Sequence, residues 1–197
     1  YRIMKESGWL CRTRPKKVPN LGQTYHVTDN KLDRDFQADK PMEKLVTDIT
    51  YLYFENCRLY LSSIMDLYNR EIVAYTISEC QDTDFVLDTL NQLELPQGAL
   101  LHSDQGSVYT SKAYYQACTE KGITRSMSRK GTPADNACIE WFHSVLKSET
   151  FYLHKWRSLT KDSITDIVKN YILFYNETRI QQKLNDQSPV DYRKLVA

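Results

Sequence analysis

Hydrophobic and polar positions divide the chain into a first part rich in strand-like segments and a second part rich in helix-like segments. Residues 44–54 are mostly β-branched, aromatic or aliphatic and include no Gly or Pro, which favours a strand. Two similar runs follow at residues 59–65 and 72–77, after turn-prone connections. Because these connections are short, we expect the three strands to form an antiparallel meander.

The rest of the chain predicts mainly helices. Apolar residues recur at helical spacing in four segments, which are residues 83–93, 110–121, 136–149 and 161–175. We expect Asp82 or Thr83 to cap the first helix and Asp135 to cap the third. Gly122 suits the left-handed conformation that ends the second.

Two short apolar runs between these helices indicate buried strands, at residues 99–102 and 123–127. Together with the meander, they predict an α/β protein with a ribonuclease H-like mixed five-stranded sheet. In this fold three antiparallel strands are followed by strands paired in parallel through helical crossovers, and helices flank the sheet. Residues 18–43 show no clear period and indicate a linker or an extended lead-in.

Composition and charge narrow the picture only slightly. With 197 residues, 41% of them hydrophobic and 26% charged, the chain fits one folded domain with appendages. A formal net charge of +1 gives no indication of nucleic-acid binding. Residues 1–17 are locally basic, which indicates either a basic arm or an ordinary solvated surface.

Cysteine usage and the apolar runs indicate the compartment. Five widely spaced cysteines without a C-x-x-C pair argue against a disulfide framework and against structural zinc. No apolar run approaches the roughly 18 residues of a membrane-spanning helix, and the first residues contain no apolar signal core. We therefore expect a cytosolic protein that does not interact with membranes.

Three acidic residues are the strongest candidates for chemistry. Asp48 lies in the middle of a predicted strand, Asp104 just past a strand end, and Glu140 one turn into a predicted helix. Each alone is readily explained as a solvated acid, a turn former or a helix-surface residue. Together, such positions can converge at one edge of the sheet, where close carboxylates repel each other unless a cation compensates.

An all-oxygen set of ligands favours magnesium or manganese, and the absence of a Cys/His cluster disfavours zinc. Two such ions, roughly 3.5–4 Å apart, can activate an attacking oxygen and stabilise a leaving one during displacement at phosphorus. A serine hydrolase is disfavoured, because neighbouring strand residues such as His102 and Ser103 face opposite ways and no G-x-S-x-G motif surrounds them.

Polar residues also share one face of the third predicted helix. Asn136, Glu140, His143 or Ser144, and Lys147 recur there at three- and four-residue steps. An acid and a lysine two turns apart can hold a metal ion at one end and a DNA phosphate at the other. An exposed pair without a shared role is the alternative.

Several separated motifs resemble those of the insertion-sequence DDE transposases, a family related to retroviral integrases. The motifs lie at residues 47–51, 102–109, 126–137 and 146–149, with a closing motif at 175–179 and 188–192. Between the second acid and the third lie 35 residues, the spacing expected for this group. The resemblance covers about residues 44–192.

The resemblance implies roles for individual residues. The implied metal ligands and catalytic residues are Asp48, Asp104 and Glu140. The residues implied to support the site are His102, Gly106 and Asn136. Lys147 would contact DNA, and further candidate phosphate contacts are Arg129, Lys130 and Arg179, the first two equally explained by solubility.

The implied function is DNA strand cleavage followed by strand transfer with two Mg²⁺ or Mn²⁺ ions. Water would hydrolyse a phosphodiester at an element end, and the freed 3′-hydroxyl would attack a second phosphodiester. The expected partners are the DNA of element ends and target and further copies of the chain in a homo-oligomer, at the nucleoid of a bacterial cytosol. The alternatives are a ribonuclease H-like nuclease that cuts without joining, and a non-catalytic DNA-binding module.

The chain departs from the family pattern at Gln181, where the closing motif commonly has His. The family also carries DNA-binding helices upstream of its core, and residues 1–17 resemble only the end of such a region. We therefore expect recognition of the element ends to be missing or incomplete here. The expected organisation is a basic arm and linker at 1–43, a catalytic core at 44–158, and a C-terminal helix and tail at 159–197.

Overall fold

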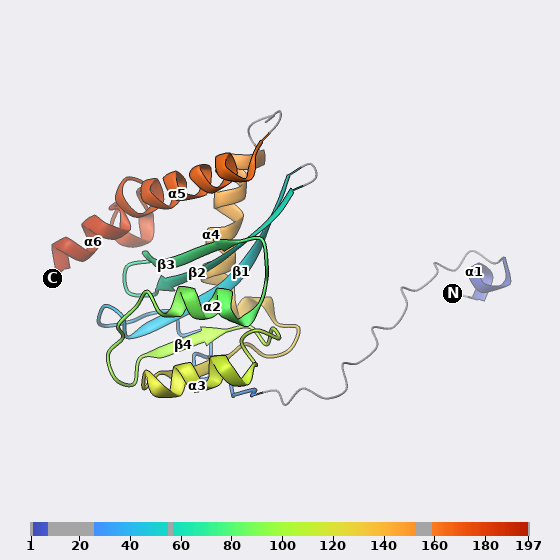
Figure 1. The fold of residues 1–197 in the computed structure, drawn as a ribbon, viewed down its shortest axis with the longest axis horizontal. Coiled ribbons are helices and arrows are strands. Elements are labelled where there is room, and N and C mark those ends of the chain that lie inside the picture. The colour runs from blue at the N-terminus through green and yellow to red at the C-terminus, as the bar shows by residue number, and fades with distance from the viewer. Residues whose placement is uncertain (1, 8–25, 55–56, 153–158, 197) are drawn as a thin grey trace.

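The computed structural model of the chain describes residues 2–7, 26–54, 57–152 and 159–196. Its centre is a five-stranded sheet in the order β3-β2-β1-β4-β5 (Figure 1). The strands are β1 (Lys44–Phe54), β2 (Cys57–Asp66), β3 (Ile72–Ser78), β4 (Leu100–Ser103) and β5 (Thr124–Met127). The first three pair antiparallel, whereas β1 with β4 and β4 with β5 pair in parallel. The predicted ribonuclease H-like sheet is therefore confirmed.

Helices are present in the four segments where the apolar spacing predicts them, and two short helices near the chain ends were not predicted. They are α1 (Arg2–Glu6), α2 (Thr83–Leu90), α3 (Lys112–Glu120), α4 (Ala137–Leu146), α5 (Lys161–Glu177) and α6 (Pro189–Val196). Single turns add η1 (Pro133–Asn136), the π-helical η2 (Lys147–Tyr152) and η3 (Gln182–Leu184). As predicted, Asp82 caps α2 by accepting a hydrogen bond from Phe85 N at 2.9 Å, and Gly122 follows α3 with a φ of +66°.

The prediction that Asp135 caps the third helix is wrong. Its carboxylate is completely buried in η1, where Arg129 donates three hydrogen bonds to it at 2.8–3.0 Å and Arg34 donates one at 2.7 Å. The Arg129 side chain holds the pKa of Asp135 far below its usual range. Because two guanidinium groups neutralise it, this acid forms a buried charge cluster instead of a cap, and α4 begins two residues later, at Ala137.

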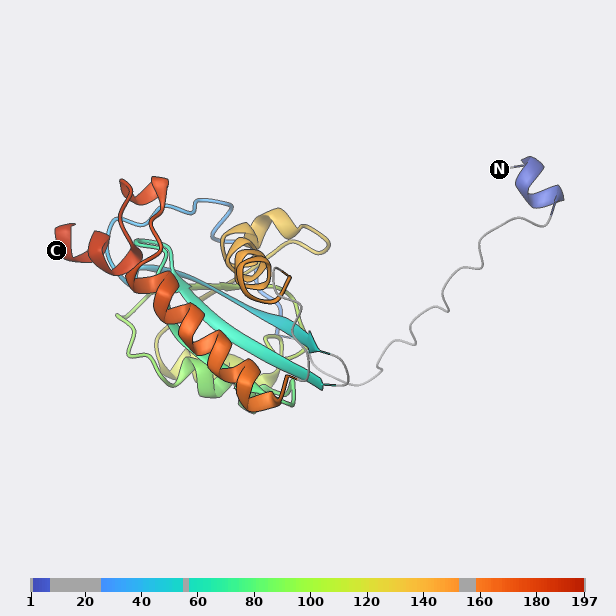
Figure 2. The same cartoon turned by 90° about the horizontal axis from the view of Figure 1, so that it is seen from above.

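Helices cover both faces of the sheet and create two hydrophobic cores. α2 and α3 lie on one side, and α4 and α5 lie on the other (Figures 1 and 2). Neighbouring β1 residues face opposite sides, so Leu45 packs in the core with α2 and α3 while Val46 packs in the core with α4 and α5. The residue two positions after Val46 therefore lies on the side of the sheet that α4 covers.

The lead-in to the sheet packs more closely than its lack of periodicity suggested. In residues 26–43, Leu32 is 2% exposed and belongs to the core beneath α4 and α5. The backbone N–H groups of Lys31 and Leu32 donate to Ser126 Oγ at 2.9 and 3.0 Å. A single buried leucine in a polar stretch gives no periodic signal. Most of the predicted basic arm at 1–17 lies outside the described residues.

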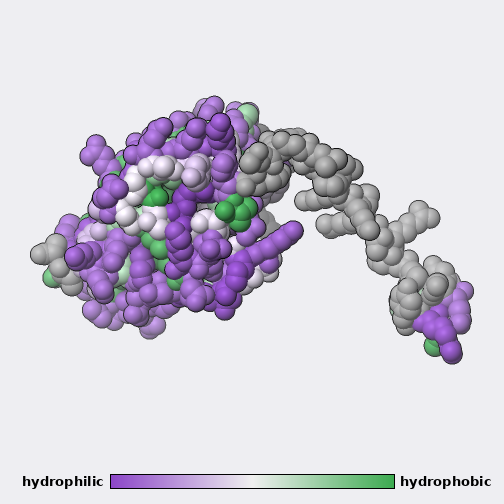
Figure 3. All heavy atoms as spheres, turned by 90° about the horizontal axis from the view of Figure 1, so that it is seen from below, coloured by the Kyte–Doolittle hydropathy of each residue, from purple (hydrophilic) through white to green (hydrophobic). Residues whose placement is uncertain are grey.

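The polar C-terminal tail folds back onto the sheet through α6. Arg193 of α6 donates to Asp66 Oδ2 at 2.8 Å, and Asp66 is completely buried at the end of β2. The protein face in Figure 3 is predominantly hydrophilic. Within the described ranges, none of the helices combines the length and the apolar character needed to cross a bilayer.

Candidate active site

β1 places Asp48 on the face of the sheet that α4 covers. Asp48 lies two residues after Val46 and so shares its face. Its side chain is 20% exposed, and Oδ2 lies 3.4 Å from Nδ1 of His143 on α4. The other ring nitrogen of His143 lies 2.8 Å from Ser63 Oγ on β2. Asp48 is therefore held from behind by a buried histidine and still reaches solvent.

β4 brings Asp104 to the same level of the sheet. Val46 pairs with His102 in the parallel β1–β4 ladder, and each aspartate lies two residues beyond its member of this pair. Asp104 Oδ1 accepts a hydrogen bond from the backbone N–H of Gly106 at 2.8 Å. A Cβ at Gly106 would lie 2.9 Å from this oxygen, so a side chain at this position would collide with the carboxylate.

α4 supplies the third acid, Glu140, from its first turn. Its start is tied to β1, because Asn136 Nδ2 donates to the carbonyl of Thr47 at 3.1 Å. Thr47 immediately precedes Asp48, so this hydrogen bond couples the position of α4 to that of the strand aspartate. Glu140 itself is exposed.

The three carboxylates share one electrostatic environment. Burial raises the pKa of Asp104, and the nearby charge of Asp48 raises it further. Glu140 is only partly shielded from solvent, and this partial desolvation, followed by the charges of Asp48 and Asp104, raises its pKa. Residues separated by up to 92 positions in the chain therefore influence each other's charge in the fold.

A surface pocket of about 380 Å³ opens beside these acids. Its lining residues are Asp48, Thr50, Glu140, His143, Ser144, Lys147 and Tyr152. Asp104 does not line it, since its carboxylate folds back onto Gly106. Among the residues that the structure describes, no three His, Cys, Asp or Glu side chains stand close enough to hold one metal ion. The donors are carboxylate oxygens, which in kind suit a hard divalent cation.

Of the four predicted DNA contacts, Lys147 alone lies in this pocket. Burial lowers the pKa of Lys147, and the charge of Asp48 opposes the shift. Arg129 is bound to Asp135, and Arg179 pairs with Glu149 at 2.7 Å. Lys130 is exposed.

Of the three predicted supporting residues, His102 lies behind the acids. It is completely buried, with Nδ1 2.8 Å from Ser126 Oγ and Nε2 3.0 Å from Ser128 Oγ. Burial lowers the pKa of His102 to about 4, so the ring is neutral at physiological pH. It joins β4 to β5 and the loop after it, two residues before Asp104.

Two further residues lie at the site, and the sequence analysis gave neither of them a role. His143 lies three residues after Glu140 on the same helix face, and that spacing was the available signal. Tyr109 is buried with its hydroxyl 3.3 Å from Thr47 Oγ1. Burial raises the pKa of Tyr109 well above its usual value, and Asp48 adds to the shift. Its sequence context does not distinguish it from an ordinary core tyrosine.

The chain is similar to known proteins over most of its length. Two family models, each described as an integrase core domain, match residues 38–133 and 140–196. A protein of Escherichia coli (strain K12) named as the InsK transposase for insertion sequence element IS150 is 40% identical, over 87% of this chain and 62% of its own length. A transposase-like protein of Haemophilus influenzae is 38% identical, over 98% of this chain and 90% of its own length.

Solved structures share the fold at low sequence identity. A chain of the simian T-cell lymphotropic virus intasome superposes with a TM-score of 0.67 at 16% identity, covering 86% of this chain and 59% of that one. The HTLV-2 integrase catalytic core in complex with magnesium gives a TM-score of 0.61 at 13% identity, covering 77% and 96%. The chain therefore belongs to the insertion-sequence transposases of the integrase core family.

Proposed function

We propose that this chain cuts DNA and joins the cut end to a second DNA, and that Asp48, Asp104 and Glu140 form its catalytic site. The observation that carries the proposal is geometric: Asp48 and Glu140 line one pocket, and the parallel pairing of β1 with β4 brings Asp104 to the level of Asp48. The chain spans 62% of the IS150 relative and 90% of the Haemophilus influenzae relative. We assign the activity to residues 44–158, between the flanking segments 1–43 and 159–197.

We propose that the three acids hold two Mg²⁺ or Mn²⁺ ions. When bound, such ions supply charge stabilisation for displacement at phosphorus. Two carboxylates with raised pKa values in a shared site fit this role, because a divalent cation relieves the repulsion between them. To reach the same ions as Asp48 and Glu140, the Asp104 carboxylate would have to give up the hydrogen bond that it accepts from Gly106 N.

The surrounding side chains position the acids and the DNA. His143 fixes Asp48 from the α4 side, and Asn136 holds α4 against β1. Lys147 lies two turns after Glu140 on the same pocket wall, where its ammonium can contact a DNA phosphate. Gly106 leaves room for the Asp104 carboxylate.

The proposed reaction has two displacements at phosphorus. In the first, water attacks a phosphodiester at an element end, and the bond from phosphorus to the 3′-oxygen breaks. In the second, the freed 3′-hydroxyl attacks a target phosphodiester, so one phosphorus–oxygen bond forms as another breaks. No covalent link to the protein forms. Joining two element ends would require at least two copies of the chain, at the DNA of a bacterial nucleoid.

Incubation with a pre-cleaved DNA end and a supercoiled plasmid in Mg²⁺ tests this proposal. We expect joined products from the wild type and from Glu94→Gln, a control acid located before β4, and none from Asp104→Asn. Cleavage without joining would instead support the ribonuclease H-like nuclease. Equal joining by wild type and Asp104→Asn would contradict the proposed site.

A further inference from the structure

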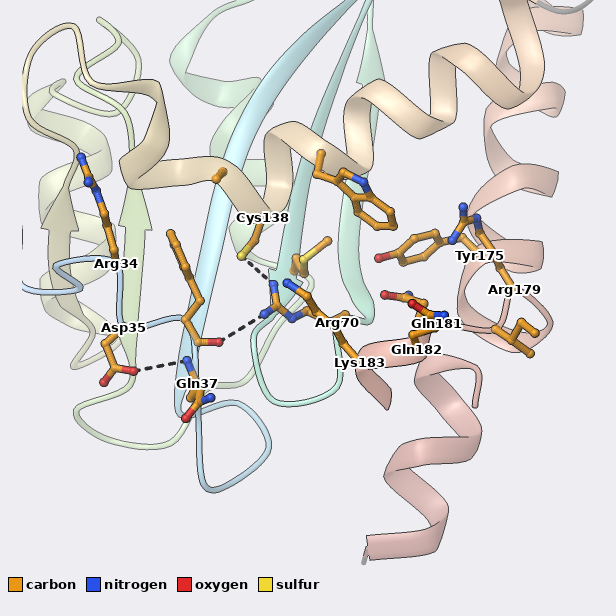
Figure 4. Close-up of a pocket in the computed structure, with 15 residues that line it drawn as sticks. Arg34, Asp35, Gln37, Arg70, Cys138, Tyr175, Arg179, Gln181, Gln182 and Lys183 are labelled. Atoms are coloured by element: carbon orange, nitrogen blue, oxygen red, sulfur yellow. Dashed lines mark hydrogen bonds between the residues drawn. The ribbon is translucent and has the colours of Figure 1, made fainter. Parts of the chain in front are cut away.

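A second cavity, of about 770 Å³, lies on another face of α4 (Figure 4). Its walls come from residues 34–37, the turn between β2 and β3, the first turns of α4, and residues 175–183. It shares no lining residue with the pocket beside Glu140. This volume is within the usual range of small-molecule sites, about 300–1,000 Å³.

Two buried polar groups line this cavity, and each retains a donor hydrogen without an acceptor among the described residues. They are the hydroxyl of Tyr175, a residue that is 0% exposed, and Nε2 of Gln181. Burial raises the pKa of Tyr175 to about 12, so its hydroxyl remains a donor at neutral pH. Gln181 can donate to the Tyr175 oxygen, which leaves the Tyr175 O–H and the second amide N–H of Gln181 without an acceptor. Buried donors are nearly always satisfied in proteins, so these two remaining donors indicate a ligand with acceptor atoms. Gln181 is also the position where the chain departs from the family pattern.

The charge of the cavity favours an anion. Arg34 and Arg179 are neutralised by Asp135 and Glu149, whereas Arg70 forms no ion pair with any carboxylate in the described part of the chain. Its guanidinium donates only to Cys138 Sγ and, at 3.5 Å, to the carbonyl of Phe36 (Figure 4). A guanidinium left without a carboxylate can bind a phosphate with two hydrogen bonds.

Arg70 occupies a backbone conformation that a non-glycine residue rarely adopts. Its φ is +62° in the turn between β2 and β3, where glycine would be the unstrained choice. An arginine in this position turns its side chain into the cavity. Strain of this kind persists when the surrounding structure enforces it and is found most often at functional sites.

The outer wall of the cavity offers an aromatic surface. Trp141 is 44% exposed and Ile180 is 65% exposed. The Arg179 guanidinium carbon lies 5.4 Å from the centre of the Trp141 ring, so this partly exposed ring already takes part in one cation–π contact. Base stacking on aromatic side chains is a general mode of single-strand recognition.

We propose that this cavity binds a nucleotide, with its phosphate at Arg70, Tyr175 and Gln181 and its base on Trp141. The nucleotide would be either a free nucleotide or one unit of a DNA strand that continues past the catalytic acids. The second alternative rests on the function proposed above. α4 separates the two sites, and a helix with its side chains is about 10–12 Å thick. A few nucleotides of a strand can cross that distance.

Titration of the 197-residue chain in metal-free buffer, followed by tryptophan fluorescence, tests this inference. The probes are dAMP, deoxyadenosine, inorganic phosphate and a single-stranded oligonucleotide of about 12 nucleotides. We expect dAMP to bind more tightly than deoxyadenosine or phosphate, and Trp141→Phe to abolish its signal. Arg70→Gly should weaken binding about tenfold or more, and Tyr175→Phe about threefold or more.

The melting temperature of each variant shows whether a loss of binding reflects a loss of folding. Arg70→Gly relieves the positive φ, and Tyr175→Phe removes a hydroxyl whose proton has no acceptor among the described residues, so neither should lower Tm. Binding of the oligonucleotide alone would place the nucleotide within a strand, and equal binding of dAMP would identify a free nucleotide. Asp104→Asn should retain binding, so a failure of strand transfer leaves this inference intact. No fluorescence change with any probe, or equal affinity in wild type and Arg70→Gly, would overturn it.

Discussion

At the residue scale, Asp104 and Glu140 destabilise the fold when they are ionised. Burial and mutual repulsion raise the pKa values of Asp104 and Glu140 above those of ordinary carboxyls. A raised folded-state pKa means that the stability contribution is complete below the ordinary pKa and is lost as pH rises through the folded one. At neutral pH the ionised acids therefore oppose folding.

Asp104→Asn should consequently raise stability while it abolishes activity. The asparagine oxygen can still accept the hydrogen bond from Gly106 N, and the charge near Asp48 is removed. We expect Tm at pH 7 without metal to rise by about 1–2 °C and strand joining to fall by at least about a hundredfold. Differential scanning fluorimetry and a joining assay check the two parts. A lower Tm would show that the carboxylate stabilises the fold.

The same pKa shifts predict how metal affinity depends on pH. Protons compete with the cation for Asp104 and Glu140, so Mn²⁺ affinity should fall as pH decreases from about 8 to about 5. Because the pKa values of Asp104 and Glu140 are raised, metal affinity should decrease at a higher pH than it would with carboxyl groups of ordinary pKa. Electron paramagnetic resonance of free Mn²⁺ measures it directly. An affinity independent of pH over that interval would contradict the shifts in these two acids.

At the element scale, α4 organises the site because it is fixed to the sheet at two points. Asn136 bonds the carbonyl of Thr47, and His143 bridges Asp48 and Ser63. The helix thereby holds Glu140 at a set position relative to β1. Side chains that orient metal-binding carboxylates commonly affect affinity or activity by about 10- to 100-fold.

His143→Ala should lower the joining rate about tenfold, with weaker Mn²⁺ binding but intact folding. His143→Asn places an amide near the Nδ1 position and should restore part of both, because it can again hydrogen-bond Asp48. Steady-state joining rates and Mn²⁺ titration of the two variants make the comparison. If Asn restores nothing while circular dichroism shows both variants folded, His143 does not act through Asp48.

α6 should contribute stability through Arg193, which pairs with the buried Asp66 at 2.8 Å and with Glu71 at 3.3 Å. Asp66 is completely buried and accepts hydrogen bonds from Met42 N, Tyr68 N and Arg193. Arg193→Met leaves that carboxylate without its cation, which should cost about 1–3 kcal/mol. Urea unfolding measures the loss, and Lys194→Met, at an exposed neighbour, serves as the control. Equal stability of the two variants would show that α6 is not held by this pair.

The sequence predicted the elements whose patterns are local. β1 has the predicted bounds, and the buried side of α5, including Ile164 and Val168, follows the apolar stripe. The role of Asp135 was not predictable, since it depends on Arg34, 101 positions away in the chain. Leu32 was missed for the same reason, because its burial depends on long-range packing rather than on a repeat.

At the whole-molecule scale, the sheet assembles acids from distant parts of the chain. Sequence motifs made the three acids candidates for the site, whereas their proximity depends on the parallel pairing of β1 with β4 and on the packing of α4. The cavity at Arg70 could not be predicted in this way. It forms from four separate segments, and neither the positive φ of Arg70 nor the burial of the Tyr175 hydroxyl has a sequence signature.

The proposed metal site is tested most directly by Mn²⁺ binding. The measurement compares the 197-residue chain with single and double variants of the three acids. We expect Asp48→Asn, Asp104→Asn and Glu140→Gln each to lose most of the binding, and Glu94→Gln to lose none. Asp48→Asn combined with Glu140→Gln should be little worse than either alone, because residues that act as a unit are not additive. Unchanged binding in any of the three single variants, or losses that multiply in the double variant, would contradict a shared site.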